Sequence, residues 1–562
     1  MDVIEVDRTP IEADVLVVGG GIAGLMASIR AAELGAKTVV ADKANPLRSG
    51  SAGLGTDHFI CYIPEVHGPN IKPIIEEHMI SLFGGWYYDL DLVYTYYKNS
   101  FEIVKRWESY GIPMRPHGFW EFAGHAFPNR PRIFLKYAGR DQKHALVKVA
   151  REKGVQIISK TPIIDLITKN GRVIGAIGLD VSRDEPLIKI FRAKSVVLCT
   201  GCTVRLFPSI TPAWLFNISH CPANTGAGIA MAYRSGAKLV NMEIPYTHAG
   251  PKYLARAGKA TWIGVLTDFY GNRISPWATK PSRELGDIAA DIWHEVFDFL
   301  PRSGRSPVYM DCSETSDEDI EYMIWGLENE GNITLLDYLK AEGLNFKRFR
   351  YEFTRYEPII TGGRGIEIDV KGKTSLEGLY AAGDVVGNFR AGTGGAAVFG
   401  WIAGESAAEH AKKVPSFEEA EKSPVIEEKV RFCSSLLSRD KGASWKEFNI
   451  ALQQIMNDYV KIRSATMLKA ALKYLDILER KARNSLRVEN SHELMRALEV
   501  FDLLEVGRIV TLAILQRDET RPPHTRLDCP WTNPLYNNLL LTIKNVDGKP
   551  VFEWRRRRES TS

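Results

Sequence analysis

The sequence predicts an α/β fold built on a Rossmann-like parallel sheet, and three observations support this prediction. A short apolar run at residues 14–18 is followed at once by a glycine-rich turn, a helical apolar pattern and a second short strand at residues 38–41. A β-branched run at residues 195–201 leads into another turn near the middle of the chain. Residues 374–384 predict a turn, a strand and a final Gly-Asp pair. Short continuous apolar runs are typical of strands buried in a parallel sheet.

The length and composition indicate a soluble protein of several domains. The chain has 562 residues, which is too long for one ordinary core, so we expect two to four domains. Its net charge of only +4 gives no reason to expect nucleic acid as a partner. We interpret the basic run at residues 555–558 as a solvated tail. No export signal and no apolar stretch of membrane-spanning length is visible, so we expect a cytoplasmic protein without direct membrane insertion.

The cysteines argue against a disulfide framework and against a metal cluster. The chain has seven scattered cysteines, an odd number at low density, which favours a reducing compartment. Cys199 and Cys202 form a C-x-x-C pair where a predicted strand enters a turn, and we interpret them as core and turn residues rather than a redox pair. No second cysteine cluster is present to hold zinc or an iron–sulfur centre, so we expect no metal site.

The first glycine-rich turn has the pattern G-x-G-x-x-G in the context that dinucleotide binding requires. Gly19 permits the tight turn, Gly21 lets the backbone approach a pyrophosphate, and Gly24 lets the following helix pack close to the strand. The start of that helix offers unpaired N–H groups to phosphates. Asp42, 18 residues after Gly24, ends the second strand and is placed to accept hydrogen bonds from ribose hydroxyls.

The later part of the chain indicates FAD rather than NAD. The Gly383-Asp384 pair ends a predicted strand, and a small-residue helical stretch begins at Gly392. The start of such a helix, facing a flavin, would stabilise negative charge on the reduced ring, and Asp384 would bond the ribityl chain. The candidate cofactor-binding residues are Gly19, Gly21, Gly24, Asp42, Lys43, Arg48, Ser49, Gly50, Gly55, Thr200, Gly201, Gly383, Asp384, Gly394 and Ala396.

Two further stretches carry a resemblance to a known family. Residues 225–243 contain a T-G-x-G-x-x-M-A pattern and then A-K-L-V-N-M-E, and residues 517–530 contain R-D-E-T-R-P-P-H-T-R-L-D-C-P. Together with the nucleotide-binding segments they resemble the flavoprotein subunits of the succinate dehydrogenase and fumarate reductase superfamily. That superfamily includes L-aspartate oxidase and the alpha subunit of adenylylsulfate reductase, and the resemblance extends over nearly the whole chain.

The resemblance implies a domain organisation. Residues 1–240 and 356–415 would form the FAD-binding domain, residues 241–355 an inserted α+β capping domain, and residues 416–520 a helical bundle. Residues 521–562 would be an extension that packs back on the core. The helical assignment also has support in the sequence, since Ser444 and Glu447 form a candidate capping box before an apolar helical pattern.

The chain departs from the family pattern at the flavin loop. Members with covalently bound flavin carry a histidine in the loop after the second strand. Residues 48–56 contain no histidine, and we interpret the nearby His58 as an ordinary loop residue. We therefore expect non-covalent FAD. The tripeptide Arg48-Ser49-Gly50 resembles the sequence at this position in the adenylylsulfate reductase branch of the family.

The substrate positions implied by the family are only partly retained. The histidine after the M-E pair is kept as His248, whereas Gly286 stands where fumarate reducers carry a proton-shuttling arginine. Residues 357–363 lack the family histidine, and Arg390 matches the family arginine after a shift of one residue. A site that grips carboxylates and delivers a proton needs cations and an acid, so this incomplete set disfavours simple fumarate or succinate chemistry.

A cationic and aromatic segment follows His248. One interpretation makes Lys252 and Arg256 groups that hold an anion and Trp262 a stacking wall, and the other is a surface loop with solvated charges. The candidate catalytic residues are His248, Arg256, Arg390 and Lys252. The alternatives are a satisfied core histidine for His248 and a structural salt bridge for Arg390.

Three functions stay open at this point. The first is an FAD-dependent oxidoreductase subunit resembling the alpha subunit of adenylylsulfate reductase, which exchanges electrons between a small anionic substrate and a separate ferredoxin-like iron–sulfur protein. The second is a stand-alone reductase or dehydrogenase of an activated C–C bond that is not specific for fumarate. The third is a flavin electron-relay subunit without a substrate of its own, for which His248→Ala and Arg256→Ala would leave activity unchanged.

Overall fold

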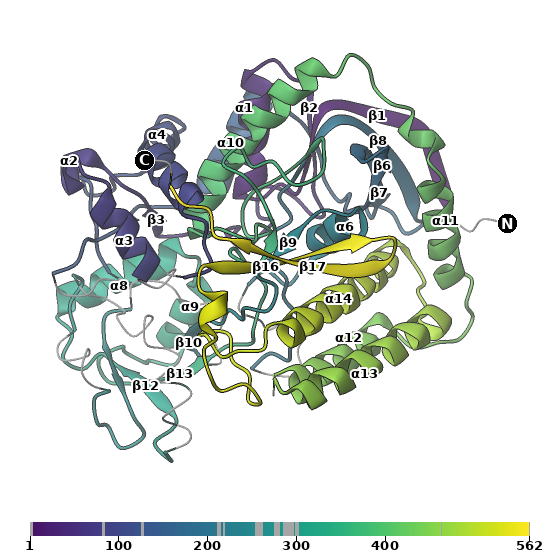
Figure 1. Ribbon diagram of the computed structural model, residues 1–562. Coiled ribbons are helices and arrows are strands. Elements are labelled where there is room, and N and C mark those ends of the chain that lie inside the picture. The colour runs from purple at the N-terminus through teal and green to yellow at the C-terminus, as the bar shows by residue number, and fades with distance from the viewer. Residues whose placement is uncertain are drawn as a thin grey trace.

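Figure 1 shows the computed structural model of the chain. The structure describes residues 4–80, 85–124, 129–210, 215, 216, 218, 220–252, 262–274, 281–284, 297, 300, 303–461 and 463–560. The main sheet has seven strands, and those that are labelled lie at the upper right, beside helices α1 and α10 (Figure 1). A capping unit lies at the lower left, and a layer of helices lies at the lower right (Figure 1).

Five strands of the main sheet are parallel, as the sequence predicts. Their order is β5–β2–β1–β8–β15, and β8 also pairs with an antiparallel meander formed by β7 and β6. The strands are β1 (Glu5–Val18), β2 (Thr38–Ala41), β5 (Gln156–Ile158), β6 (Ile163–Lys169), β7 (Arg172–Asp180), β8 (Leu187–Leu198) and β15 (Leu379–Ala381). The ends of β1, β2 and β8 are fully or almost fully buried, which explains their unbroken apolar runs.

Helix α1 (Ile22–Glu33) is held between the sheet and helix α10 (Gly392–Lys413) by residues without large side chains. A Cβ atom added to Gly400 would lie 2.4 Å from the carbonyl oxygen of Ala23, and one added to Gly404 would lie 2.2 Å from that of Ala27. Glycine is therefore required for the two helices to approach this closely. Helix α5 (Gln142–Glu152) covers another side of α1.

Additional elements of the first domain surround this core. A two-stranded sheet and helix α4 pack beside α10, and α4 buries Tyr96, Tyr97 and Trp107 on one face. These elements are α2 (Pro64–His67), α3 (Lys72–Ile80), α4 (Leu90–Ser109), α6 (Ala227–Arg234), β3 (His58–Ile60) and β4 (Phe134–Lys136).

The capping unit has its own sheet and its own core. Its four strands lie in the order β10–β13–β12–β11, all antiparallel. The elements are β10 (Ala249–Pro251), β11 (Val265–Thr267), β12 (Val308–Asp311), β13 (Tyr351–Arg355), α8 (Asp317–Asn329) and α9 (Ile333–Ala341). The Ser316 side chain caps α8 by accepting a hydrogen bond from the backbone N–H of Asp319 at 3.1 Å.

The helical layer contains α11 (Pro424–Leu437), α12 (Trp445–Ile455), α13 (Ala465–Ser485) and α14 (Ser491–Gln516). Helix α12 begins with the capping box that the sequence predicts, in which the Ser444 backbone N–H donates to Glu447 at 2.7 Å. Buried residues occur all around α14, which packs against α6, α12 and α13 (Figure 1). No helix among the described residues is long and apolar enough to cross a membrane.

The C-terminal segment forms a hairpin that joins a separate small sheet. Strands β16 (Leu539–Val546) and β17 (Lys549–Arg556) pair with each other, and β16 also pairs with β9 (Leu239–Val240), which pairs with β14 (Gly365–Ile366). The interpretation of residues 555–558 as a solvated tail is wrong. Arg555 contacts the buried Asp89 carboxylate at 2.7 Å because that carboxylate, at the start of α4, needs cationic partners.

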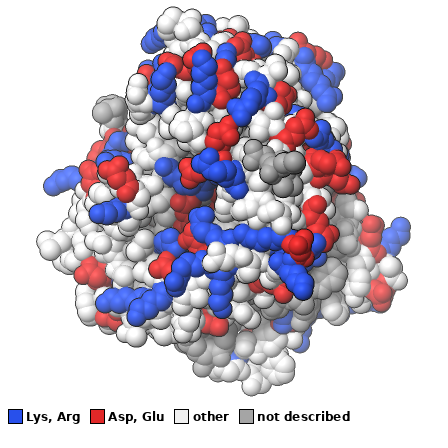
Figure 2. Space-filling view, turned by 90° about the vertical axis from the view of Figure 1, so that its right-hand side faces the viewer, with Lys and Arg blue, Asp and Glu red and all other residues white. Residues whose placement is uncertain are grey.

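The surface carries both signs of charge. On the face that Figure 2 shows, Lys and Arg side chains are interspersed with Asp and Glu side chains over most of the area. This mixture on one face agrees with the small net charge of +4.

A buried charge cluster attaches the end of α14 to the start of the capping unit. The Arg517 guanidinium donates to Glu243 and to Glu519 at 2.8 Å each, and all three side chains are fully buried. The same guanidinium lies 4.8 Å from the ring centroid of Trp86. Removing one partner of such a cluster leaves an uncompensated buried charge.

We predict that Arg517→Met lowers the free energy of unfolding by about 3–5 kcal/mol, because the fully buried Glu243 carboxylate then loses its ion-pair partner, whereas Glu519 keeps its contact with Arg521. Urea titration followed by tryptophan fluorescence measures the change. Arg480→Met, on the exposed side of α13, is the control and should leave the free energy of unfolding within about 0.5 kcal/mol of wild type. Equal stability of the two variants would contradict the prediction.

Candidate functional site

The main sheet brings four strand ends side by side at one edge. Val18 is in register with Ala41 and with Leu198, and Leu198 is in register with Ala381. The residues that follow these ends line a cavity of about 460 Å³. Ligands of parallel α/β sheets bind at the carboxyl ends of the strands, so this cavity is the candidate functional site.

The glycine turn after β1 has the geometry that the sequence predicts. Gly19 has φ +99°, and a Cβ atom there would lie 2.6 Å from the carbonyl oxygen of Cys199. A Cβ atom on Gly24 would lie 1.8 Å from the carbonyl oxygen of Gly19, so α1 meets the turn with no side chain between them. A Cβ atom on Gly21, in contrast, would have no neighbouring atom within 4 Å, and Gly21 lines the cavity. A phosphate can therefore approach the start of α1 at this position.

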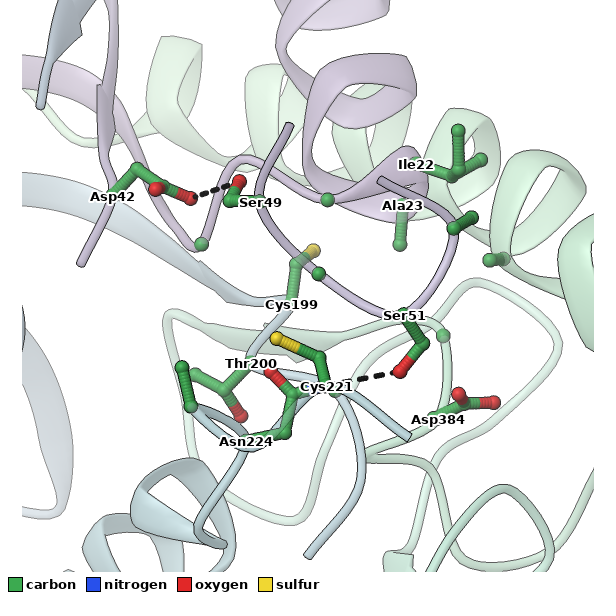
Figure 3. A pocket seen from close by; sticks show the side chains of 18 of the residues that line it. Ile22, Ala23, Asp42, Ser49, Ser51, Cys199, Thr200, Cys221, Asn224 and Asp384 are labelled. Atoms are coloured by element: carbon green, nitrogen blue, oxygen red, sulfur yellow. Dashed lines mark hydrogen bonds between the residues drawn. The ribbon is translucent and has the colours of Figure 1, made fainter. Parts of the chain in front are cut away.

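Asp42 is held at the end of β2 by the same turn. One carboxylate oxygen accepts from the Gly20 backbone N–H at 2.6 Å and from the Ser49 hydroxyl at 3.1 Å, and the other accepts from Ala44 N–H at 2.8 Å. Figure 3 shows the contact of Asp42 with Ser49 at the rim of the cavity. The neighbouring Lys43 also lines the cavity, but its ammonium group contacts Glu499 of α14 at 2.9 Å.

A second helix begins at the cavity. Gly392 and Ala396, in the first turns of α10, line it together with Asp384. The N-termini of α1 and α10 both open on the cavity, and their partial positive charges favour an anionic ligand. Gly394 instead faces the protein interior, since a Cβ atom there would lie 2.3 Å from the Tyr96 hydroxyl oxygen.

Of the predicted cofactor residues, all except Gly24 and Gly394 line this one cavity. Those two glycines make close packing contacts instead. The residues present fit FAD: an open glycine turn, an acidic residue at the end of β2, two helix N-termini and a Gly-Asp strand end surround the space.

Several lining residues were not predicted. The Asn224 amide donates to the Ser51 hydroxyl at 3.2 Å across the cavity wall (Figure 3). His220 and Cys221 lie just before the T-G motif at Thr225, and Glu330 comes from the end of α8. Residues 220–224 directly precede that motif, and this proximity was the only signal in the sequence that could have indicated that they line the cavity.

A buried lysine supports the glycine turn from behind. The Lys143 ammonium donates to the Gly20 carbonyl oxygen, and Lys143 itself is 1% exposed. Burial lowers the pKa of Lys143 to about 8, although the nearby Asp42 carboxylate acts in the opposite direction. Nothing in the sequence around Lys143 indicates this contact, because it joins residues 123 positions apart.

Cys199 and Cys202 are buried, as expected for core and turn residues. Burial raises the pKa of the Cys199 thiol well above its usual range and that of Cys202 to about 12. Thiols with raised pKa are inert at neutral pH. The Cys202 sulfur lies 3.7 Å from the amide nitrogen of Asn224 and contributes to the cavity wall only from behind.

The structure brings together two of the four predicted catalytic residues. His248 Nε2 lies 2.6 Å from the hydroxyl oxygen of Tyr246 and 3.4 Å from Nη2 of Arg390. Arg390 lines the cavity, whereas His248 is 2% exposed and does not. The His248 ring is stacked on the ring of His220, with centroids 5.5 Å apart and an interplanar angle of 27°.

The Arg390 guanidinium is charged in this environment. Its carbon lies 3.7 Å from the ring centroid of Tyr246. Burial opposes the charge, but Tyr246, Tyr88 and the Asp384 carboxylate outweigh it and raise the pKa of Arg390 above its ordinary value. A buried, permanently protonated guanidinium at the edge of a cavity is suited to binding an anion.

The segment after His248 is placed away from the cavity as far as the structure describes it. The Lys252 ammonium contacts Glu352 at 2.7 Å on the capping sheet, and Lys252 does not line the cavity. Trp262 is fully buried in the capping core, edge-on to Phe353 at 5.0 Å between ring centroids, so it is not a stacking wall. Arg256 lies outside the described residues, as do the prediction at Gly286 and its surroundings.

A charged cluster joins the capping unit to the first domain beside the cavity. The Asp57 carboxylate contacts His58 at 2.7 Å and the Lys136 ammonium at 3.0 Å, and His58 also lies 3.6 Å from Glu330. Burial alone would raise the pKa of Asp57, but Lys136 and His58 hold it well below its usual range. Among the described residues, one group has the side-chain types and the spacing of a metal site, namely Asp57, His58 and Glu330. The Lys136 ammonium already supplies a cation there.

Comparison with known families decides the identity of the fold and its cofactor. Residues 14–298, just over half of the chain, match the family described as FAD binding domain, and residues 449–556 match the fumarate reductase flavoprotein C-terminal family. The chain belongs to this family of flavoproteins. It binds FAD and is an FAD-dependent oxidoreductase. The predicted fold class and cofactor are thereby confirmed.

Individual relatives cover nearly the full length. A Methanothermobacter marburgensis protein that is named as a subunit of fumarate reductase (CoM/CoB) is 26% identical over 568 residues, covering 95% of this chain and 98% of the relative. A solved adenosine-5-phosphosulfate reductase in complex with sulfite has a TM-score of 0.84 at 20% identity, over 99% of this chain and 97% of that chain. A quinol-fumarate reductase with menaquinol molecules has a TM-score of 0.81 at 20% identity, over 99% of each chain.

Gly21 and Gly24 of the glycine turn after β1 make a matched pair for a test. We predict that Gly21→Ala folds with wild-type stability but binds FAD at least about 10-fold more weakly, because the new methyl group enters the space that a phosphate needs. Gly24→Ala should instead lower the free energy of unfolding of the apoprotein by about 1–3 kcal/mol, because its methyl group overlaps the Gly19 carbonyl.

The Kd of FAD is measured by titration with flavin fluorescence as the readout. The free energy of unfolding is measured by urea denaturation of the apoprotein. The opposite assignment, with Gly21→Ala unstable and Gly24→Ala only weaker in FAD binding, would contradict the geometry of the turn.

Proposed function

We propose that this chain is the flavoprotein subunit of an enzyme of the fumarate reductase and adenylylsulfate reductase type. It exchanges electrons between a small anionic substrate and a separate ferredoxin-like iron–sulfur protein in the cytoplasm. The observation that carries the proposal is the position of Arg390, a buried guanidinium at the edge of the cavity beside Asp384. A permanent cation there provides a binding site for an anion beside Asp384 and the start of α10, which are expected to face the flavin.

The cysteines support a separate electron-transfer partner. The seven cysteines of the chain include no cluster with the spacing of an iron–sulfur site, and all seven are free. The relative from Methanothermobacter marburgensis is named as a subunit, which fits a chain that works with another protein. Bound FAD supplies the electron-pair chemistry. This chain supplies the cavity, the Arg390 guanidinium, and the two stacked histidines His220 and His248.

Non-covalent binding of FAD is part of the proposal. Residues 48–56, which line the cavity beside the turn, contain no histidine. Among the described residues of the cavity, His220 is the one histidine, and it belongs to a segment far from that loop in the sequence. A covalent bond of the kind made by a loop histidine is therefore not expected.

The two other functions make different demands on Arg390. A stand-alone C=C reductase would need no partner protein and would have to bind an enoate. A relay subunit would have no substrate, and Arg390 would then be structural. The stacking of Arg390 on Tyr246 at 3.7 Å is equally compatible with a structural role, so a substitution decides between them.

We predict that the holoenzyme oxidises reduced methyl viologen in the absence of oxygen when supplied with fumarate or with adenosine-5-phosphosulfate. Arg390→Met should lower kcat/KM for the active substrate about 100-fold, because the charge-assisted bonds to the substrate anion are lost. Arg480→Met on the exposed side of α13 is the control and should match wild type. Turnover by Arg390→Met at the wild-type rate would contradict the proposed role of Arg390. A flavin-loaded wild-type protein that turns over neither substrate would favour the relay function.

A further inference from the structure

The histidine that lines the cavity is not the one that the sequence predicts. His220 is half-buried and lines the cavity. His248 is 2% exposed, does not line the cavity and lies behind His220, with the two rings stacked at 5.5 Å. Of the two stacked histidines, His220 is therefore the one that a ligand in the cavity can reach.

His248 is fixed in this second layer by contacts on two sides. Its Nε2 atom lies 2.6 Å from the Tyr246 hydroxyl oxygen, and its backbone carbonyl oxygen accepts from the Tyr356 N–H at 2.7 Å. Nη2 of Arg390 lies 3.4 Å from the same Nε2 atom. These contacts orient the His248 ring, which in turn supports the ring stacked on it.

His220 and Arg390 lie at the same end of the cavity. Both contact His248, one through ring stacking and the other through Nη2, so they are separated by no more than one side chain. Arg390 also lies beside Asp384, since a Cβ atom on Gly362 would lie 3.0 Å from Arg390 Cγ and 3.5 Å from Asp384 Oδ1. The pair therefore lies at the end of the cavity where the residues that follow β15 meet the first turn of α10.

The chemistry of the pair selects the ligand. A guanidinium offers only N–H donors, and an imidazole adds one or two more. Two nitrogen-bearing side chains that line the same cavity, one of them permanently charged, match a small oxyanion such as a carboxylate or a sulfur oxyanion.

We propose that His220, together with Arg390, binds the oxyanion of the substrate, and that His248 and Tyr246 are positioning residues that hold this pair in place. The inference rests on the proposed function, because it assumes a small anionic substrate. It goes further by assigning the substrate-facing imidazole to His220.

The experiment uses the FAD-loaded enzyme and two probe anions, malonate for a carboxylate and sulfate for a sulfur oxyanion. Each is titrated while the visible spectrum of the flavin is followed. His220→Leu should raise the Kd of the bound anion about 10-fold or more, because a leucine side chain has no N–H group to donate to the charged ligand. His144→Leu, at an exposed position of α5, is the matched control and should leave the Kd unchanged. Perturbation by malonate assigns a carboxylate and perturbation by sulfate assigns a sulfur oxyanion, and either supports the proposal.

A rescue experiment separates a cavity-facing histidine from one in the second layer. Added imidazole should restore anion binding to His220→Ala, because that substitution opens a space that is continuous with the cavity. It should not restore binding to His248→Ala, whose space is closed off by the neighbouring side chains. Rescue of His248→Ala but not of His220→Ala would overturn the assignment.

Three further results would count against the inference. An unchanged Kd in His220→Leu would overturn it, and an altered flavin midpoint potential in the same variant would then place His220 against the flavin. A wild-type enzyme that turns over a substrate but binds neither probe anion would overturn this inference and leave the proposed function intact. An enzyme that neither turns over nor binds an anion would overturn both.

Discussion

The close packing of helix α1 is the constraint on which the rest of the structure depends. On one side Gly24 meets the backbone of the glycine turn, and on the other Ala23 and Ala27 meet the glycines of α10. A side chain larger than hydrogen at Gly24, Gly400 or Gly404 would separate these elements. Because both helices are fixed against the sheet, both of their N-termini open on the same cavity, and two segments 370 residues apart in the sequence cooperate in binding one cofactor.

The parts of the fold that the sequence predicts are those with local causes. The strand, turn, helix, strand and acidic residue at positions 14–42 follow one another without interruption, and each has a backbone requirement that only a few residue types satisfy. The Gly-Asp pair that follows β15 and the capping box of α12 are local in the same sense. For this reason nearly all of the cofactor residues proposed from the sequence lie around the cavity.

The parts that the sequence does not predict depend on contacts between distant segments. His220 lines the cavity with its ring stacked on that of His248, and no periodicity or motif in the sequence predicts that stacking. Lys252 looked like an anion-binding group, but a carboxylate on the neighbouring strand pairs with it. The C-terminal arginines looked solvated, but Asp89 at the start of a distant helix binds them. In each case the partner, which the sequence does not reveal, decides the role of the charge.

The most direct test of the account is to ask whether the cavity holds FAD without a covalent bond. The purified protein is examined by its visible spectrum and then precipitated with acid, and the flavin in the supernatant is identified and quantified. The account predicts a yellow protein that releases about one FAD per chain into the supernatant, as expected for a single site held by backbone and polar contacts. Yellow colour that stays in the pellet would contradict non-covalent binding, and a colourless protein that cannot be reconstituted with FAD would contradict the central claim.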